Sequence, residues 1–451
     1  MKLLLRIVAW LLAVLFSSAL IALLVGMVWL WPSYDYLPAQ AAPFTAQRLP
    51  QNPQIYAVEP EHNYLNINYP SVIRVPDWVE NPLGKYYLYF SHHKGSYIRM
   101  AYADSPGGPW TVYKGGVLSL SESGFPDRVG GKPDTITVLR DLFATFSPQV
   151  VRDYLILAYR AMITDPAERE ARGISAAANE APHISSPELV VDEQNKQLLM
   201  IFHGYDERGG QSSALARSAD GLVFSRAADT QPLLSTYLRS FTYRDRYYLL
   251  GMPGVLYRSD SLSGPYLPRD RGLFEPDMRH AGLWLQGDSL YVFWSQVGYA
   301  PERLMLSVVD LSDPDWNRWQ ATAPVDVLLP ELPWEGGLLP VSVSLRGELD
   351  MPARELRDPY VFQDDDGQLY LYYVGGGEQG IGVARLLTER QATRLKQAEM
   401  LERARSLERP QPIAEPQPTA EPESTVETES SAGPEPTAGP EPTAGPEESA
   451  L

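Results

Sequence analysis

The chain has 451 residues, of which 44% are hydrophobic and 11% aromatic, a composition that excludes a disordered protein and fits one large domain or two smaller ones. It contains no Cys, so disulfides, cysteine–zinc sites and thiol nucleophiles are excluded. The formal net charge of −18 argues against a nucleic-acid surface. Nine Glu and no Lys or Arg lie in 410–451, so a mildly acidic body is followed by a strongly acidic tail.

The N-terminus carries a long apolar segment. Residues 7–31 contain no charge, and as a helix they would span roughly 37 Å, enough to cross the hydrocarbon core of a bilayer. Lys2 and Arg6 precede the segment, and no basic residue follows before Arg48. This asymmetry predicts a single-pass membrane protein whose N-terminus is cytoplasmic and whose body is periplasmic or extracellular. A cleaved signal peptide and a buried core helix are the alternatives.

Residues 60–385 show a weak internal repeat. Each unit has a polar start, a short apolar strand, a turn of Gly, Asp or Asn, and a second strand centred on aromatic residues, which is a hairpin signal. The five units are NYPSVIRV…GKYYLYFSHH, SSPELVVDEQNKQLLMIFHG, SFTYRDRYYLLG, HAGLWLQGDSLYVFWSQ and RDPYVFQDDDGQLYLYYVGGG. Five such copies predict an all-β protein, a five-bladed β-propeller. A β-sandwich, the alternative, does not explain a turn that recurs at the same offset.

The remaining segments have other patterns. Apolar residues recur at spacings of three and four between about 135 and 180, which predicts a helical insertion that either buttresses the propeller or forms a lid over its substrate mouth. The Pro- and Glu-rich C-terminus cannot bury a core, which predicts a disordered spacer or, alternatively, a partner-binding tail. The predicted organisation is a transmembrane signal-anchor helix at 1–32, a linker leading into the propeller at 33–59, the propeller at 60–385, a charged helix at 386–408 and the tail at 409–451.

Polar residues at the starts of the five inner strands converge on one face of a propeller, where a site is expected. Pro187-Glu188 lies at the start of the second unit, His280 at the start of the fourth, and Arg357-Asp358-Pro359 at the start of the fifth. In this repeat and in these motifs, the chain resembles the five-bladed propellers of glycoside hydrolase family 43 and relatives such as family 32. In family 43 a carboxylate follows Pro in the second blade and a His often lies near the channel in the fourth. Arg-Asp-Pro is similar to the transition-state motif of family 32, where it lies in an earlier blade.

The resemblance also implies a base Asp before Pro in the first blade and an acid Glu opening the third. In this chain Tyr69 precedes Pro70, and Leu238 and Arg239 lie where the Glu would fall. The catalytic motif set is therefore degenerate, with two of the usual carboxylates absent from their usual places.

Glycoside hydrolases nevertheless ordinarily use two carboxylates, one acid and one base or nucleophile. Asp358 and Glu188 are the best-placed pair at the strand starts, and we predict that they are catalytic. As structural alternatives, Glu188 bonds a neighbouring backbone amide and Asp358 pairs with Arg357. Glu275 and Asp277 lead into the fourth unit and are weaker candidates.

Imidazole and guanidinium groups recur near the same strand ends. Imidazole serves as a general acid or base near neutral pH, and Arg binds carboxylated or sulfated glycans through bidentate contacts. Structural roles and salt bridges to Asp are the alternatives. The predicted substrate-binding residues are His92, His93, His280, Arg357, Arg279, Arg239 and His203. No metal site and no cofactor are predicted.

The resemblance and the predicted site favour one function over two others. We predict a membrane-anchored, exported glycoside hydrolase-like protein that acts on the glycosidic bonds of a poly- or oligosaccharide outside the cytoplasm. The alternatives are a non-catalytic carbohydrate-binding propeller and a scaffold of an envelope complex. The sugar, the linkage, and retention or inversion of configuration are left open.

Overall fold

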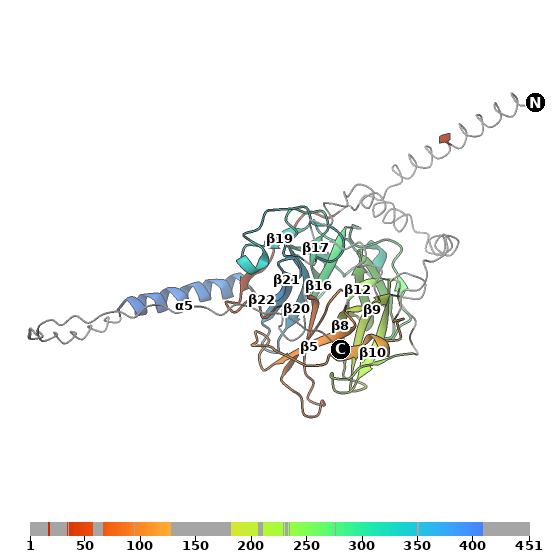
Figure 1. Cartoon of the computed structure of the whole chain (residues 1–451). Coiled ribbons are helices and arrows are strands. Elements are labelled where there is room, and N and C mark those ends of the chain that lie inside the picture. Colours follow the sequence, from red (N-terminus) through yellow and green to blue (C-terminus); the bar gives the residue numbers. More distant parts are fainter. Residues whose placement is uncertain are drawn as a thin grey trace, which may run out of the picture. The chain divides into compact units, whose positions relative to one another are not determined.

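The computed structural model describes residues 36–56, 66–127, 182–205 and 211–408, apart from seven single positions within them, together with Ser17, Ser18 and Tyr34. The chain divides into two compact units, Met1–Lys396 and Gln397–Leu451. The sheets all lie in the first unit (Figure 1).

The first unit contains five antiparallel sheets in sequence order. The first blade consists of β3 (Asn68–Arg74), β4 (Tyr86–Ser91), β5 (Tyr97–Ala103) and β6 (Thr111–Val112), with β7 (Leu118–Ser119) paired to β5. The second consists of β8 (Ile184–Asp192), β9 (Gln197–Tyr205), β10 (Gln211–Ser218) and β11 (Ser225–Arg226). The third consists of β12 (Thr236–Tyr243), β13 (Arg246–Met252), β14 (Val255–Ser259) and β15 (Leu267–Pro268).

The last two blades complete a ring. The fourth consists of β16 (Met278–Gln286), β17 (Ser289–Gln296), β18 (Leu304–Asp310) and β19 (Val325–Leu328). The fifth consists of β20 (Leu356–Gln363), β21 (Leu369–Gly375) and β22 (Gly380–Leu387), to which β1 (Thr45–Arg48) and β2 (Ile55–Tyr56) add on the outer edge. Because β1 and β2 precede the first blade in the sequence, they tie the start of the ring to its end.

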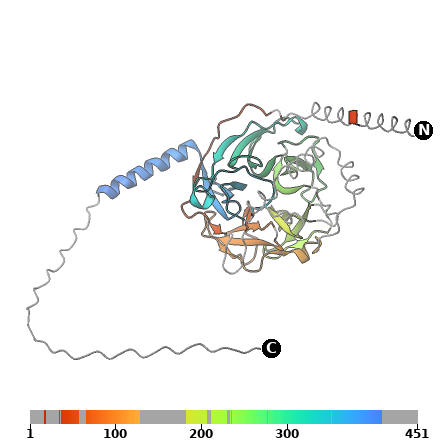
Figure 2. The same ribbon diagram turned by 45° about the horizontal axis from the view of Figure 1, so that its top comes forward.

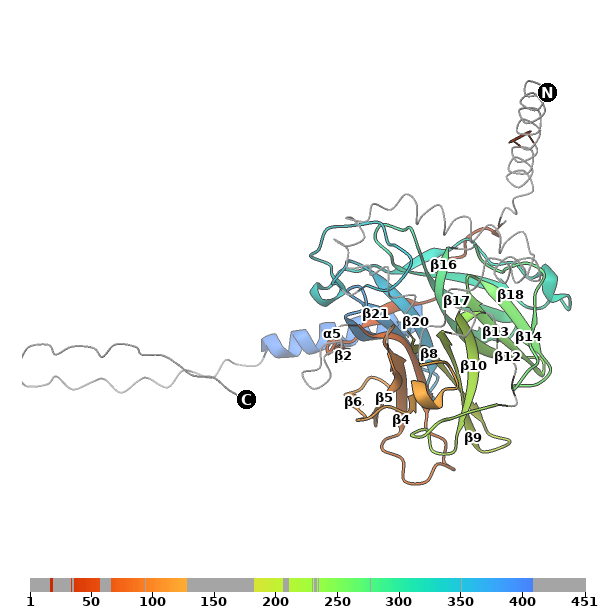
Figure 3. The ribbon, with the colours of Figure 1, turned by 45° about the vertical axis from the view of Figure 1, so that its right-hand side comes forward.

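The colours in Figure 2 follow the sequence around this ring. The first strand of each blade contacts the first strand of the next, and β20 contacts β3, so the five inner strands surround one axis. Of these inner strands, β8, β12, β16 and β20 are labelled in Figure 3. The predicted five-bladed propeller is therefore confirmed, and the β-sandwich is excluded. The described helices are η1 (Leu120–Glu122), η3 (Trp316–Arg318), η4 (Pro333–Glu335) and α5 (Glu389–Glu408).

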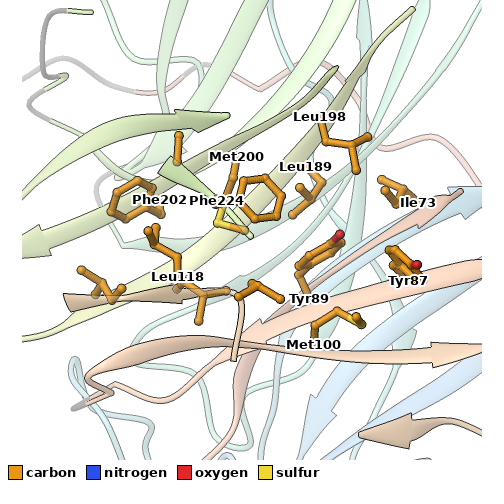
Figure 4. Packing of buried hydrophobic residues seen from close by; sticks show 14 of the residues in the cluster. Ile73, Tyr87, Tyr89, Met100, Leu118, Leu189, Leu198, Met200, Phe202 and Phe224 are labelled. Carbon is orange, nitrogen blue, oxygen red and sulfur yellow. The ribbon is translucent and has the colours of Figure 1, made fainter. Parts of the chain in front are cut away.

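The apolar core lies between adjacent blades. Tyr89 and Met100 of the first blade pack against Met200 and Phe202 of the second, and all four side chains are fully buried (Figure 4). Each buried side chain of this size contributes about 1.5–3 kcal/mol relative to an exposed one. A blade that lacked its neighbours would expose this surface, which is why the repeat must close into a ring.

Every inner strand carries a β-bulge near its start. The pairing of each inner strand with the next strand shifts at this point in all five blades. Four of the bulges hold a non-glycine residue with φ of 52–53°: Tyr69, Ser186, Tyr237 and Asp358. Such backbone is uncommon for residues with a Cβ, and a bulge changes the direction of a side chain. We call the face of the ring at which the inner strands begin the mouth.

Several predictions fall on other parts of the chain. The helical insertion at about 135–180 and the tail at 409–451 lie outside the described residues, whereas the charged helix at 386–408 corresponds to α5. In the part of the chain that the structure describes, no helix is both long and apolar enough to cross a bilayer. This finding corrects the predicted single-pass membrane location. The apolar segment that led to that prediction, 7–31, lies outside the described residues except for Ser17 and Ser18.

Candidate active site

Asp358 and His280 form a buried pair at the mouth. His280 Nδ1 contacts Asp358 Oδ1, and the backbone N–H of Tyr69 donates to Asp358 Oδ2 at 3.1 Å. Burial alone would raise the pKa of Asp358, but His280 outweighs it and the pKa is lowered. Burial lowers the pKa of His280. Both directions describe an ionised Asp358 in contact with a neutral imidazole.

Tyr237 lies beside this pair and connects it to the second blade. Its ring centroid is 4.1 Å from that of His280 and 4.7 Å from that of His203. His203 Nδ1 contacts Ser186 Oγ, and burial lowers the pKa of the imidazole. Its Nε2 is buried and has no hydrogen-bond partner among the described residues. The mouth therefore holds a compact cluster of aromatic and imidazole rings.

A second carboxylate–imidazole pair also lies near Tyr237. His93, in the turn between β4 and β5, places Nδ1 at 3.0 Å from Glu378 Oε2, and its ring centroid is 6.2 Å from that of Tyr237. Burial alone would lower the pKa of His93, but the Glu378 carboxylate outweighs it and the pKa is raised. The pair therefore favours a protonated His93 beside an ionised Glu378.

Buried ion pairs hold Glu378 and the adjacent guanidinium groups. Arg357 donates to Glu378 Oε1 at 2.8 Å and to Glu355 Oε2 at 2.9 Å. Arg279 donates to Glu302 Oε1 at 2.8 Å. Both guanidinium groups are almost fully buried and paired, so they stabilise the mouth and present little free charge.

Glu188 belongs to a different network. Its Oε2 accepts from Arg239 Nη1 at 2.9 Å, and its Oε1 accepts from the Ser240 N–H at 2.9 Å and the Ser240 hydroxyl at 2.8 Å. Arg239 also donates to the carbonyl oxygens of Pro70, Ala281 and Pro359. One guanidinium thus joins all five blades, since its own strand is in the third and its partners are in the other four.

Tyr69 separates the two networks. The Arg239 guanidinium lies over the Tyr69 ring at 3.6 Å from its centroid, while the Tyr69 N–H binds Asp358 on the mouth side. The predicted catalytic pair, Asp358 and Glu188, therefore lies on either side of one residue. The catalytic role of both residues stays a prediction.

The other predicted residues fall into two groups. His93, His203 and His280 gather around Tyr237, and His92 adjoins them in sequence with partial exposure. The arginines do not gather there: Arg279 and Arg357 pair with buried carboxylates and Arg239 lies in the axial network. Of the two alternatives for the carboxylates, Glu188 does bond a backbone amide, whereas Asp358 pairs with His280 in place of Arg357.

The sequence reasoning missed several residues at the mouth. Glu378 lies in the Gly-rich run GGGEQG and was not among the predicted site residues. Its turn joins the second and third strands of its blade, as do the turns that carry His93 and Glu302. That shared position was a usable signal, because equivalent turns meet on the same face of a propeller. Tyr69, Tyr237 and Glu355 were also missed.

Among the residues that the structure describes, no group of three His, Asp or Glu is arranged to hold a metal ion. The imidazoles of the mouth are instead engaged with carboxylates, a hydroxyl and aromatic rings. Carboxylate and imidazole side chains of this kind can carry out acid–base chemistry.

The fold and the site together define a five-bladed β-propeller with buried carboxylate–imidazole pairs at its mouth. No family model matches the chain. Uncharacterized protein R118 of Acanthamoeba polyphaga mimivirus is 30% identical over 349 residues, covering 72% of this chain and 84% of that protein. The chain belongs to the same family as this mimivirus protein.

Solved structures with a similar fold include glycoside hydrolases. A putative glycoside hydrolase from Bacteroides ovatus ATCC 8483 is 14% identical with a TM-score of 0.48, covering 77% of this chain and 97% of that one. A thermostable family-43 glycoside hydrolase is 12% identical with a TM-score of 0.41, covering 71% and 88%. The xylan β-1,4-xylosidase of Bacillus halodurans C-125 is 12% identical with a TM-score of 0.43, covering 76% and 55%. Family 43 is the family that the sequence resembles, and the chain's own five-sheet ring defines its fold class.

Proposed function

We propose that this protein is a glycoside hydrolase that acts on a poly- or oligosaccharide at the mouth of the propeller, with Asp358 as its reactive carboxylate. The observation that carries the proposal is the Asp358–His280 pair, in which a buried carboxylate is held ionised where residues from four blades meet. The resemblance of the repeat and of the Arg357-Asp358-Pro359 motif to glycoside hydrolase propellers supports the same conclusion.

The chemistry requires a group that accepts a proton from the attacking water. An ionised carboxylate that is fixed by two donors and lacks a cation at salt-bridge distance suits this role. Asp358 meets this description, since its partners are a neutral imidazole and a backbone N–H. Glu188 does not, because Arg239 and Ser240 engage both of its oxygens. We therefore assign the role of catalytic base to Asp358 and a structural role to Glu188.

The arginines bear on the class of sugar. Glu302, Glu355 and Glu378 neutralise Arg279 and Arg357 within the protein. A carboxylated or sulfated glycan would have to compete with these buried pairs. The proposal therefore takes a neutral glycan as substrate, bound by hydroxyl, imidazole and aromatic groups.

A second candidate function is glycan binding without turnover. It is favoured by the burial of Asp358, which is 0% exposed and has a donor on each oxygen. A carboxylate so enclosed serves equally well as part of a rigid binding site.

One experiment separates the two functions. The full-length chain is incubated with a panel of neutral aryl glycosides and polysaccharides, and product release is measured for the wild type, Asp358→Asn and Asp365→Asn. Asp365 is the control, since its side chain is 73% exposed beside Arg74. We expect wild-type turnover, a loss of about 10²–10⁴-fold in Asp358→Asn, and an unchanged rate in the control. Binding of a glycan in calorimetry without turnover would favour the second function, and an active Asp358→Asn variant would reject the first.

A further inference from the structure

Hydrolysis of a glycosidic bond also requires an acid that protonates the leaving oxygen. At the position where the resemblance places this acid, the chain has Leu238, which is 1% exposed, and Arg239, which is fully committed to the axial network. Neither side chain can donate a proton to a substrate at neutral pH. If the proposed function holds, the proton must therefore come from elsewhere at the mouth.

We propose that His93 is the proton donor of the reaction and that Glu378 is the residue that positions it. The inference rests on the proposed function and assigns a second residue to the same site. His93 Nδ1 is 3.0 Å from Glu378 Oε2, and the imidazole side chain is 14% exposed whereas Glu378 is fully enclosed. Within the described residues no hydrogen bond engages His93 Nε2. This atom is also not among the buried polar atoms that lack a partner, so it is not fully buried. The ring is thus held at one nitrogen and open at the other.

Glu378 is fixed more firmly than an ordinary turn residue. Its Oε1 accepts from Arg357 Nη1 at 2.8 Å, and its Oε2 accepts from the Leu349 N–H at 3.2 Å and contacts the amide of Asn66. Burial alone would raise the pKa of Glu378, but His93 and Arg357 outweigh it and the pKa is lowered. A carboxylate held in this way sets both the orientation and the charge of the imidazole that faces it.

Of the charged groups around His93, some raise its pKa and others lower it. Glu378, Glu348 and Asp358 raise the pKa of His93. The neighbouring imidazoles His203 and His280 repel a protonated His93, as shown by the effect of His93 in lowering their pKa values. The net direction is upward, so His93 keeps its proton in a pH range where an isolated imidazole loses it.

Asn68 lies at the same nitrogen. Its side-chain Nδ2 is 2.8 Å from His93 Nδ1. When Nδ1 carries a proton, it donates to Glu378, and a turned Asn68 amide presents its oxygen to the ring. The turned amide remains compatible with Ser91, whose hydroxyl contacts Asn68 and both donates and accepts.

The donor and the base both lie near Tyr237. The Tyr237 ring centroid is 6.2 Å from that of His93 and 4.1 Å from that of His280. His280 in turn contacts Asp358. A sugar bound over Tyr237 would therefore lie close to both an acid and a base, and direct hydrolysis needs both.

The step balances with water as the only co-reactant. The bond between the anomeric carbon and the leaving oxygen breaks, its electron pair goes to that oxygen, and the oxygen takes the proton of His93 Nε2. The oxygen of a water molecule bonds to the anomeric carbon, and one proton of that water goes to the Asp358 carboxylate. Asp358 then releases its proton to solvent and His93 takes one up, which restores both groups.

A leaving-group test measures this role in the full-length chain. Aryl glycosides of one sugar are compared, carrying either 2,4-dinitrophenol, which leaves without protonation, or phenol, which needs it. For His93→Gln we expect kcat/KM to fall about 10²–10⁴-fold on the phenyl glycoside and less than about tenfold on the dinitrophenyl glycoside. An equal loss on both substrates overturns the assignment of His93 and leaves the proposed function standing. A wild-type chain that hydrolyses neither substrate overturns the proposed function and the catalytic step together.

The role of Glu378 is tested by titration. In the wild type, kcat/KM should decline on the alkaline side as His93 loses its proton, at a pH above 6.5, the ordinary pKa of histidine. Glu378→Gln should move this decline to lower pH, and Glu378→Asp should restore part of the shift. The imidazole resonance that disappears in His93→Gln identifies His93 in NMR spectra, so its pKa is measured without any substrate. A pKa at or below 6.5, or one unchanged in Glu378→Gln, overturns the inference whatever the activity.

Discussion

Two ionic networks lie close to the axis of this propeller, and they are built differently. In the axial network, a permanently charged guanidinium meets Glu188 and three carbonyl oxygens. At the mouth, Asp358 and Glu378 face imidazoles, whose charge depends on pH. Both networks are buried, so burial alone does not identify the functional one.

The difference shows what each network is suited to do. The partners of Arg239 are one carboxylate and three backbone carbonyls from the other four blades, so the axial network holds blades together. The imidazole pairs keep proton-exchanging atoms at the point where the inner strands begin, and His93 is partly exposed. Perturbed titratable groups of this kind mark functional sites more often than saturated ion pairs do.

The largest expected effect is the loss of the axial guanidinium. Arg239→Ala leaves Glu188 buried without its cation and leaves the Pro70, Ala281 and Pro359 carbonyls without a donor. Removing one partner of a buried ion pair destabilises a protein by about 3–5 kcal/mol. We expect the free energy of unfolding in urea to fall by this amount.

The matched control is Arg244→Ala. Arg244 is in the same blade, 54% exposed, and paired with the exposed Asp288, so its loss should change the free energy of unfolding by less than about 0.5 kcal/mol. Equal effects of the two substitutions would show that the axial network does not hold the blades together.

A smaller effect is expected at the mouth, and it depends on pH. The pKa of Glu378 is lowered from 4.5, so its contribution to stability is complete above pH 4.5 and is lost as the pH falls below it. The pKa of His93 is raised from 6.5, so its contribution is complete below pH 6.5 and is lost as the pH rises through the raised value. The Glu378–His93 pair therefore stabilises the fold most between pH 4.5 and pH 6.5.

Glu378→Gln tests this window. We expect it to lower the free energy of unfolding by about 1.5–3 kcal/mol near pH 5.5, and by less at an alkaline pH above the raised pKa of His93. Urea denaturation at both values measures the difference. A loss that is the same at both would contradict the charge state assigned to the pair.

The smallest effect concerns the residue between the networks. The Tyr69 hydroxyl is buried and has no hydrogen-bond partner among the described residues, while its ring covers Arg239. Tyr69→Phe keeps the ring and removes the unsatisfied hydroxyl, so the free energy of unfolding should rise by about 1 kcal/mol. A decrease in the free energy of unfolding would show that the Tyr69 hydroxyl has a hydrogen-bond partner. Tyr69 would then belong to one of the two networks.

The sequence predicts the ring because its signal is repeated. A strand, a turn and an aromatic strand recur five times, and each strand start places residues such as His280 and Asp358 on one face. The closure by β1 was not predicted, because Thr45–Arg48 has no repeat of its own and pairs with a strand more than 330 residues away. Its partner becomes apparent only in three dimensions.

The site was predicted less completely than the fold. The positive φ at Tyr69, Tyr237 and Asp358 has no signature in residue type, yet it directs these side chains. Glu378 was overlooked because glycines surround it, although those glycines are what allow its turn to reach the mouth. Glu188 and Asp358 were paired from their equivalent positions alone. Only the contacts in the structure show that Glu188 pairs with Arg239 whereas Asp358 pairs with His280.

The most direct test of the division between the networks is the rate of glycoside hydrolysis per folded molecule in Asp358→Asn and Glu188→Gln, measured in full-length protein on the same 2,4-dinitrophenyl glycoside. We predict that Asp358→Asn remains folded, because the amide oxygen still accepts from the Tyr69 N–H and the amide NH2 can donate to the other tautomer of the neutral His280, and that it loses about 10²–10⁴-fold in rate. We also predict that folded Glu188→Gln keeps the wild-type rate despite a lower free energy of unfolding. An inactive but folded Glu188→Gln beside an active Asp358→Asn would contradict this division.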